Sequence, residues 1–227
     1  AIYCMSNDAK MNAIVAIPVL ADGTLDRSRL RKTLTGGYGC GANSGHDGTH
    51  GDGDMPSEED LVLSDSCIIV YDRTLFALDT GSNRVTMWRI NPDDPTLLAR
   101  VGKPVDTLGT FPTSLTYSPR NGTLAVLCNG AQSGVSTFAA VEGKGLVPLD
   151  TALRPLGGGS THDIAAGKLA GSKIMFTPQG NALVALVKGR QSVAGAASPG
   201  CVIVWDVDQG SGEAAMDGVV TELEQHG

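Results

Sequence analysis

The sequence repeats one pattern four times, and this recurrence constrains the fold more than any single motif does. Each copy starts with an apolar segment that ends in a small polar turn, and a segment of alternating polarity follows it. The paired segments are 2–7 with 13–20, 75–83 with 85–90, 124–130 with 135–141, and 183–189 with 202–207. Self-similarity at a period of roughly 50 residues, with alternating strands, is typical of a β-propeller. We therefore predict an all-β fold.

The third and fourth copies show the expected unit of short strands joined by tight turns. In the turns at 119–122 and 178–180, proline sets φ, and Asn or Gly can take a positive φ. The strands that we predict are 113–118, 124–128, 135–141 and 146–149 in the third copy, 173–177, 183–187 and 202–207 in the fourth, and 67–71 as the first strand of the second.

The first copy is incomplete, because residues 2–5 correspond to a second strand and no innermost strand precedes them. Residues 218–227 follow only the fourth copy and resemble a cut end more than a closing strand. We expect a partial propeller domain over 1–227 with about four blades. A second chain, separated from the same precursor by a cut after Gly227, would carry the other blades and stay bound to protect the open edges. A closed four-bladed ring is the alternative.

Three long connections separate the copies, at 26–66, 99–111 and 150–172. Propeller topology places them on the same face as the turns after each second strand. On this loop face we expect the side chains of Arg84, Asn129, His162, Lys188 and Arg190.

Composition excludes some partners and indicates a compartment. The net charge of −7 argues against binding to nucleic acid, and no stretch approaches the roughly 20 apolar residues of a membrane span. Five cysteines and the sequon Asn121-Gly122-Thr123, placed in a predicted hairpin turn, are typical of a secreted glycoprotein. The start at Ala1 suggests that a leading segment was removed.

Residues 75–87, 102–105 and 111–115 resemble the fungal secreted 3-carboxymuconate cyclase-like proteins, and 153–156 and 187–189 look similar to the same family. That family belongs to the seven-bladed lactonase propellers, with 6-phosphogluconolactonase and muconate lactonizing enzyme. The resemblance covers about residues 2–207 and implies about seven blades, with about three absent from this chain. It also implies lactonase or cyclase chemistry on a carboxylated or sugar-acid substrate.

One feature of that family is missing from the sequence. Members with lactone chemistry present a histidine after the proline that opens an inner strand, and the matching positions here are Thr113 and Ser172. We therefore take His162 as the candidate general base, because imidazole exchanges protons near neutral pH. Lys188, Arg190, Arg84 and Asn129 are the candidate substrate-binding residues. The alternative is an exposed loop histidine among scattered surface charges.

Residues 43–54 form a glycine-rich loop with interleaved histidines and aspartates. His46, Asp47 and His50 could bind a divalent metal, although a solvated loop is the alternative and we expect no required cofactor. Cys40 and Cys67 bracket this loop and could form a disulfide. Cys4 and Cys128 occupy equivalent strand positions, so we expect two buried thiols there.

Three classes of function fit these observations. The first is a secreted lactonase-like or cyclase-like enzyme that acts on a small acid or a carbohydrate. The second is a non-catalytic carbohydrate-binding or surface-antigen propeller, and the third is a polysaccharide lyase on uronate-containing glycans. Both tryptophans, Trp88 and Trp205, lie in predicted strands and should be buried. This favours an enzyme over a lectin with aromatic platforms.

Overall fold

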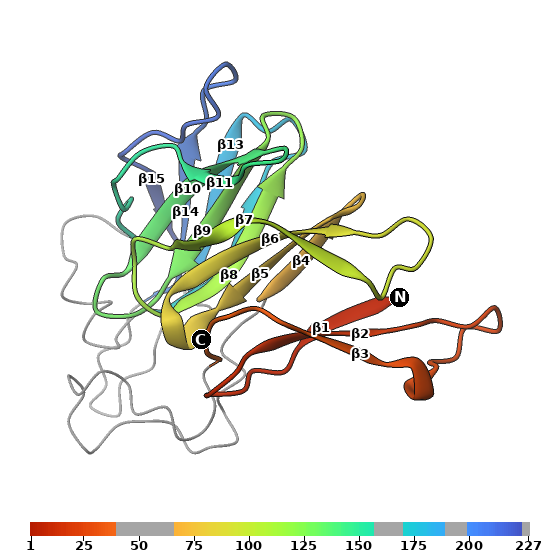
Figure 1. Ribbon diagram of the computed structural model, residues 1–227. Coiled ribbons are helices and arrows are strands. Elements are labelled where there is room, and N and C mark those ends of the chain that lie inside the picture. Colours follow the sequence, from red (N-terminus) through yellow and green to blue (C-terminus); the bar gives the residue numbers. More distant parts are fainter. Residues whose placement is uncertain (40–65, 157–169, 189–198, 224–227) are drawn as a thin grey trace, which may run out of the picture.

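The computed structural model describes residues 1–39, 66–156, 170–188 and 199–223. In these residues the chain forms four antiparallel sheets, with 3-10 helices at Arg27–Arg29 and Thr80–Ser82. The sheets follow one another in an open arc, from the red first sheet to the blue fourth sheet (Figure 1). The fold is therefore all-β, as predicted.

Within each sheet the strands pair in chain order. The first sheet has β1 (Ile2–Met5), β2 (Ala13–Ile17) and β3 (Arg31–Leu34). The second has β4 (Ile68–Tyr71), β5 (Thr74–Asp79), β6 (Arg84–Ile90) and β7 (Leu98–Asp106). The third has β8 (Pro112–Ser118), β9 (Thr123–Cys128), β10 (Gly134–Val141) and β11 (Gly145–Pro148). The fourth has β12 (Ala170–Phe176), β13 (Ala182–Lys188), β14 (Cys201–Asp206) and β15 (Val219–Glu222).

The core lies between successive sheets, and β9 shows how it is built. All six residues of β9 are buried, because both faces of its sheet are covered. Leu124 and Val126 pack in one cluster with Phe76 of the second sheet. Ala125 and Leu127 point the other way, into a cluster with Leu183 of the fourth sheet. Alternation along the strand thus serves two cores at once.

The predicted strands of the third and fourth copies are confirmed, and so is the incomplete first copy. The other three sheets have four strands and begin with an inner strand (β4, β8 or β12), whereas the first sheet has three and begins with β1, the equivalent of their second strands. In the described residues β15 pairs with β14 and not with β1. The arc is therefore open, and the alternative of a closed four-bladed ring is wrong.

Three outer strands contradict the sequence analysis. The connection predicted at 26–66 contains β3, and most of the one at 99–111 is β7. The supposed cut end contains β15. These outer strands are largely solvated and carry charges such as Arg31 and Lys32, so they lack the apolar periodicity that revealed the inner strands.

Candidate functional site: the loop face

The turns after β1, β5 and β9 lie on one face of the arc together with the chain that follows β3, β7 and β11. Three hydrogen-bonded junctions between neighbouring sheets show this arrangement. They join Asn12 to Asp79, Asn83 to Phe111, and Asn129 to Gly171. The common loop face expected from the sequence is therefore present at these junctions.

Asp79 is the centre of the junction between the first and second sheets. It ends β5 and is fully buried. Its Oδ1 accepts hydrogen bonds from Asn12 Nδ2 at 2.9 Å and Thr35 Oγ1 at 2.7 Å, whereas its buried Oδ2 has no partner. Burial raises the pKa of Asp79, although Thr35, Asn12 and Arg84 oppose this. The protonated form is thus favoured relative to an exposed aspartate.

A glycine allows this carboxyl group to be enclosed. A Cβ atom at Gly37 would lie 2.6 Å from Asp79 Oδ2 and 2.6 Å from Ser82 Oγ. Cβ atoms do not approach other heavy atoms that closely. A residue with a side chain at position 37 would therefore prevent the first sheet from packing against the second. The double glycine at 36–37 was the sequence signal for this contact, and our sequence analysis missed it.

Asn83 connects the second and third sheets through its backbone and its side chain. Its left-handed φ of 53° turns the chain between the 3-10 helix and β6. Its Oδ1 accepts a hydrogen bond from Phe111 N at 2.8 Å, and its carbonyl accepts one from Thr107 N at 2.9 Å. Nearby, Thr80 Oγ1 donates to Pro112 O at 2.8 Å. This junction fixes where β8 begins.

Asn129, a predicted substrate-binding residue, connects the third and fourth sheets. Its Nδ2 donates to Thr113 Oγ1 at 2.6 Å and to Gly171 O at 2.7 Å. Its Oδ1 accepts from Gly171 N at 2.9 Å. The amide is therefore occupied within the protein and positions β12 against β8. Thr113 and Gly171 are the partners of Asn129 in this junction. In the sequence, Thr113 was considered for a functional role only because it stands where the lactonase family has a histidine.

The remaining site predictions divide into described and undescribed residues. Arg84 begins β6 and Lys188 ends β13, so both exposed cations lie at the loop face, but on the second and fourth sheets. Within the described residues no ion pair joins them. His162 and Arg190 lie outside the described residues, as do His46, Asp47, His50 and Cys40. These roles stay predictions.

No family model and no curated protein matches this sequence. Solved structures do match it. A putative 6-phosphogluconolactonase from Bacteroides uniformis is 17% identical over 98% of this chain, with a TM-score of 0.61. One from Bacteroides fragilis is 15% identical over 98%, with a TM-score of 0.58. The periplasmic gluconolactonase of Pseudomonas aeruginosa is 20% identical over 94%, with a TM-score of 0.56.

The fold is that of a β-propeller, as in these three structures. The four sheets are therefore blades, and the first of them is incomplete. The chain spans 57%, 57% and 51% of the length of these three structures, in the order given. Identities this low establish the fold alone.

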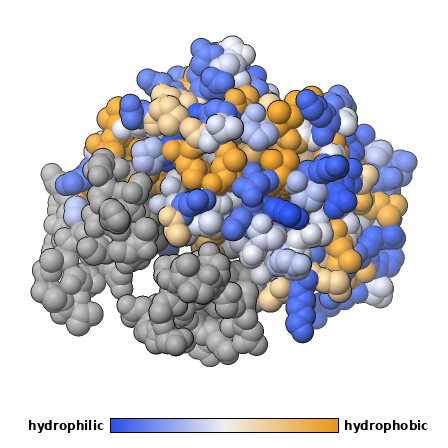
Figure 2. Space-filling model, turned by 60° about the vertical axis from the view of Figure 1, so that its left-hand side comes forward, coloured by the Kyte–Doolittle hydropathy of each residue, from blue (hydrophilic) through white to orange (hydrophobic). Residues whose placement is uncertain are grey.

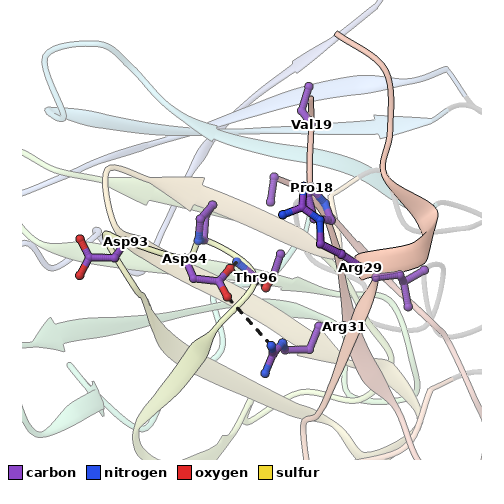
Figure 3. Close-up of a pocket in the computed structure, with 10 residues that line it drawn as sticks. Pro18, Val19, Arg29, Arg31, Asp93, Asp94 and Thr96 are labelled. Atoms are coloured by element: carbon purple, nitrogen blue, oxygen red, sulfur yellow. Dashed lines mark hydrogen bonds and ion pairs between the residues drawn. The ribbon is translucent and has the colours of Figure 1, made fainter. Parts of the chain in front are cut away.

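A pocket of about 740 Å³ lies between the β2–β3 and β6–β7 connections, between the first and second blades. Arg29, Arg31, Asp93 and Asp94 line it (Figure 3). Arg31 Nη2 lies 4.0 Å from Asp94 Oδ2, and Arg29 pairs with Asp26 outside the pocket. Hydrogen bonds from Thr96 lower the pKa of Asp94. Arg29, Arg31 and Asp94 are thus paired within the protein, and no predicted site residue lies here.

Asn121 lies in the turn between β8 and β9, which confirms the predicted hairpin turn; the turns between first and second strands lie at the opposite end of the strands from the loop face. Asn121 is half-buried, however, and not fully exposed. Its Nδ2 donates to Gly180 O at 3.1 Å, and its Oδ1 accepts from Ser118 Oγ. An N-glycan would replace one of the two hydrogens of this same Nδ2, beside the contact with the fourth blade. Glycosylation stays a prediction.

The two cysteines that were expected to be equivalent differ. Cys128 is buried, and burial raises the pKa of its thiol to about 12. Cys4 is exposed, so the prediction of a buried thiol is wrong there. The reason is that, among the described residues, the blade that contains β1 packs against another blade on one side only. Cys67 is partly buried beside the core of the second blade, and its pairing with Cys40 stays a prediction.

The described residues contain neither a metal-binding cluster nor a membrane-spanning helix. No cluster of three or more His, Cys, Asp or Glu residues in this part of the chain could hold a metal ion. No helix within it has the length and apolar character needed to cross a membrane. The predicted metal ligands at 46, 47 and 50 lie outside the described residues.

Proposed function

We propose that this chain is part of a secreted lactonase-type enzyme that hydrolyses the lactone of a carboxylated or sugar-acid substrate at the loop face. One observation carries the proposal. The chain matches, over 94–98% of its length, propellers that are described as a gluconolactonase and as putative 6-phosphogluconolactonases. The resemblance of residues 75–115 to lactonase propellers supports the same reaction class.

The chemistry assigns roles to the predicted residues. His162 takes a proton from water, the resulting hydroxide attacks the lactone carbonyl, and the ring C–O bond breaks. The protonated histidine then returns the proton to the leaving oxygen, and a hydroxy acid is released. Lys188, Arg190 and Arg84 hold the substrate carboxylate or phosphate through charge-assisted hydrogen bonds. Lys188 and Arg84 are exposed at the loop-face ends of β13 and β6, which is consistent with this role.

Hydrolysis of glucono-δ-lactone and 6-phosphogluconolactone, followed by base uptake at constant pH, tests the proposal. We expect turnover by the wild-type protein and a loss of about 10²- to 10⁴-fold in kcat for His162→Ala. Lys188→Ala should mainly raise KM. Lys144→Ala, which removes an exposed lysine from the β10–β11 hairpin, is the matched control. An absence of turnover on both lactones, or an unchanged His162→Ala variant, would contradict the proposal.

A non-catalytic carbohydrate-binding propeller is the second candidate, and the three junctions favour it. Asp79, Asn83 and Asn129 all direct polar groups at neighbouring blades and not toward an open cavity. Against it, Trp88 and Trp205 are buried as predicted, so neither provides a surface platform for a sugar ring, which favours the enzyme. Calorimetry that detects binding of gluconate without lactone turnover would identify this function.

Secretion belongs to the same proposal, because one matching structure is that of a periplasmic enzyme. Protein from a eukaryotic secretory host should lose mass on glycosidase treatment, with the modified site at Asn121. Unchanged mass would argue against glycosylation of this asparagine.

A further inference from the structure

A pocket lies at the end of the strands opposite the loop face. Strand β6 runs antiparallel to β5, whose last residue, Asp79, belongs to the loop face. The β6–β7 connection therefore lies at the other end of the second blade. The pocket of about 740 Å³ opens between this connection and the β2–β3 connection (Figure 3). Pockets of about 300–1,000 Å³ commonly bind small molecules, and the residues that line this one take no part in the proposed lactone hydrolysis.

The ion pair between Arg31 and Asp94 is loose. Its two atoms, Arg31 Nη2 and Asp94 Oδ2, lie 4.0 Å apart, which is longer than a hydrogen bond of about 2.7–3.2 Å. Asp94 Oδ1 is occupied, because it accepts hydrogen bonds from Thr96 N at 2.9 Å and Thr96 Oγ1 at 2.6 Å. Asp94 Oδ2 is therefore the atom that can accept a further bond. A hydroxyl group about 2.8 Å from each atom of the pair fits between them, accepting from Arg31 and donating to Asp94.

Arg29 and Asp93 add a second cation and a second anion to the lining of the pocket. Arg29 Nε donates to Asp26 Oδ2 at 2.5 Å, which orients the guanidinium, and its Nη atoms have no partner among the described residues. The exposed carboxylate of Asp93 likewise has no partner in the part of the chain that the structure describes. The charges of the two arginines and the two aspartates cancel, so a ligand with a net charge of either sign meets as many like charges as opposite ones. A neutral ligand rich in hydroxyl groups uses the donors and the acceptors together.

The lining also has an apolar part, which includes the proline rings of Pro18 and Pro95. Val19 and Leu30 belong to it as well, and they are 44% and 39% exposed. A sugar ring carries C–H groups besides its hydroxyls, and these C–H groups pack against such side chains through dispersion. Proline has no side-chain freedom to lose on binding, which favours the contact. Charged groups of both signs beside apolar rings therefore match the chemistry of a carbohydrate.

Hydrogen bonds hold one wall of the pocket in place. Tyr3 Oη donates to Pro95 O at 2.6 Å, which connects the first blade to the β6–β7 connection. Within that connection, Asn91 Oδ1 accepts from Asp93 N at 2.8 Å and from Asp94 N at 3.0 Å. A preformed site loses less conformational entropy when a ligand binds.

A protein-binding surface is the weaker candidate. On the face drawn in Figure 2, outside the grey residues, hydrophobic side chains are interspersed with hydrophilic ones. That face therefore presents no large apolar patch of the kind that other proteins cover.

We propose that the pocket binds a neutral carbohydrate. One hydroxyl of the sugar bridges Arg31 and Asp94. Further hydroxyls accept from Arg29 and donate to Asp93, and the C–H groups of the ring pack against the two prolines. The proposal does not rest on lactone hydrolysis, because the pocket lies at the opposite end of the strands from the loop face.

An NMR titration of the isotope-labelled protein tests the proposal with neutral disaccharides, namely cellobiose, maltose, lactose and mannobiose. We expect saturable shifts of the backbone amides of Leu30, Asp94 and Thr96, which line the pocket, with at least one of these sugars. Sodium gluconate and inorganic phosphate serve as anionic probes. An absence of saturable shifts at these amides with every sugar would overturn the proposal. Shifts with the anions alone would also overturn it and identify an anion site instead.

Two variants test the hydroxyl bridge. Asp94→Asn keeps an oxygen for the bonds from Thr96 but replaces the accepting Oδ2 with a donor, and Arg31→Leu removes the cation. We expect either change to weaken sugar binding at least about tenfold, because each removes a hydrogen bond to a charged group. Asp72→Asn and Arg73→Leu make the same changes in the exposed β4–β5 turn, outside the pocket, and should leave the affinity unchanged. Urea midpoints check that the variants are folded. Wild-type affinity in a folded Asp94→Asn or Arg31→Leu protein would overturn the assignment of the bridge.

Discussion

The third and first blades are built from the same repeat, but they differ in what covers them. The third blade lies between two neighbours, and β9 is buried along its whole length. The first blade has a neighbour on one side, and residues of β1 alternate between exposed and partly buried. Cys128 and Cys4 summarise the difference, since one thiol is enclosed and the other faces solvent. Equivalent positions in a repeat therefore acquire different chemistry from their neighbours in space.

The largest expected effect contrasts the cores of these two blades. Leu127→Ala should destabilise the protein by about 2–5 kcal/mol, because the side chain is fully buried between the third and fourth blades. Ile2→Ala, at an edge that is 43% exposed, should cost well under about 1.5 kcal/mol. Urea denaturation followed by fluorescence measures both. Similar costs for the two variants would mean that Ile2 is covered in solution.

A smaller effect separates the structural and substrate-binding roles of Asn129. Asn129→Ala leaves the backbone N–H and C=O of Gly171 without their partner, so we expect a loss of about 1–3 kcal/mol of stability. Gln132→Ala, which alters an exposed side chain in the same turn, should leave stability within about 0.5 kcal/mol. If Asn129→Ala raises KM for a lactone while the urea midpoint is unchanged, Asn129 contacts substrate and not the junction.

The smallest effect is the pH dependence of the junction between the first two blades. The pKa of Asp79 is raised in the folded protein, so its protonated form contributes stability that is present below the ordinary value of 3.8 and lost as pH rises through the raised pKa. Asp79→Asn should remove this loss and hold the urea midpoint steadier above about pH 4. Asp22 is an exposed residue whose pKa is lowered by hydrogen bonds from Thr24. The pH dependence of its contribution to stability has the opposite sign, so that contribution is lost as pH falls.

A pH series of urea midpoints for wild type, Asp79→Asn and Asp22→Asn checks these signs. A wild-type midpoint that rises between about pH 4 and 7, with Asp79→Asn identical to wild type, would show that Asp79 is ionised at little cost in the folded state.

The sequence was informative where strands are buried on at least one face. Residues 124–128 and 183–187 were predicted correctly because their apolar runs are bounded by turns. The outer strands β3, β7 and β15 were missed, since solvated strands with Arg31 or Lys32 show no such pattern. The loop face was inferred correctly, but the residues that hold it together were not. A buried aspartate such as Asp79 looks in sequence like an ordinary turn residue.

What the sequence by itself determined is the repeat: the all-β fold, the propeller type, the missing first strand and the face on which the long connections lie. These follow from local periodicity and turn chemistry, which each segment carries on its own. Tertiary structure alone decided which of two equivalent thiols is buried and why the side-chain amide of Asn129 is hydrogen-bonded within the protein. Those properties depend on which blade stands next to which, and contact between segments far apart in the chain leaves no periodic trace in either of them.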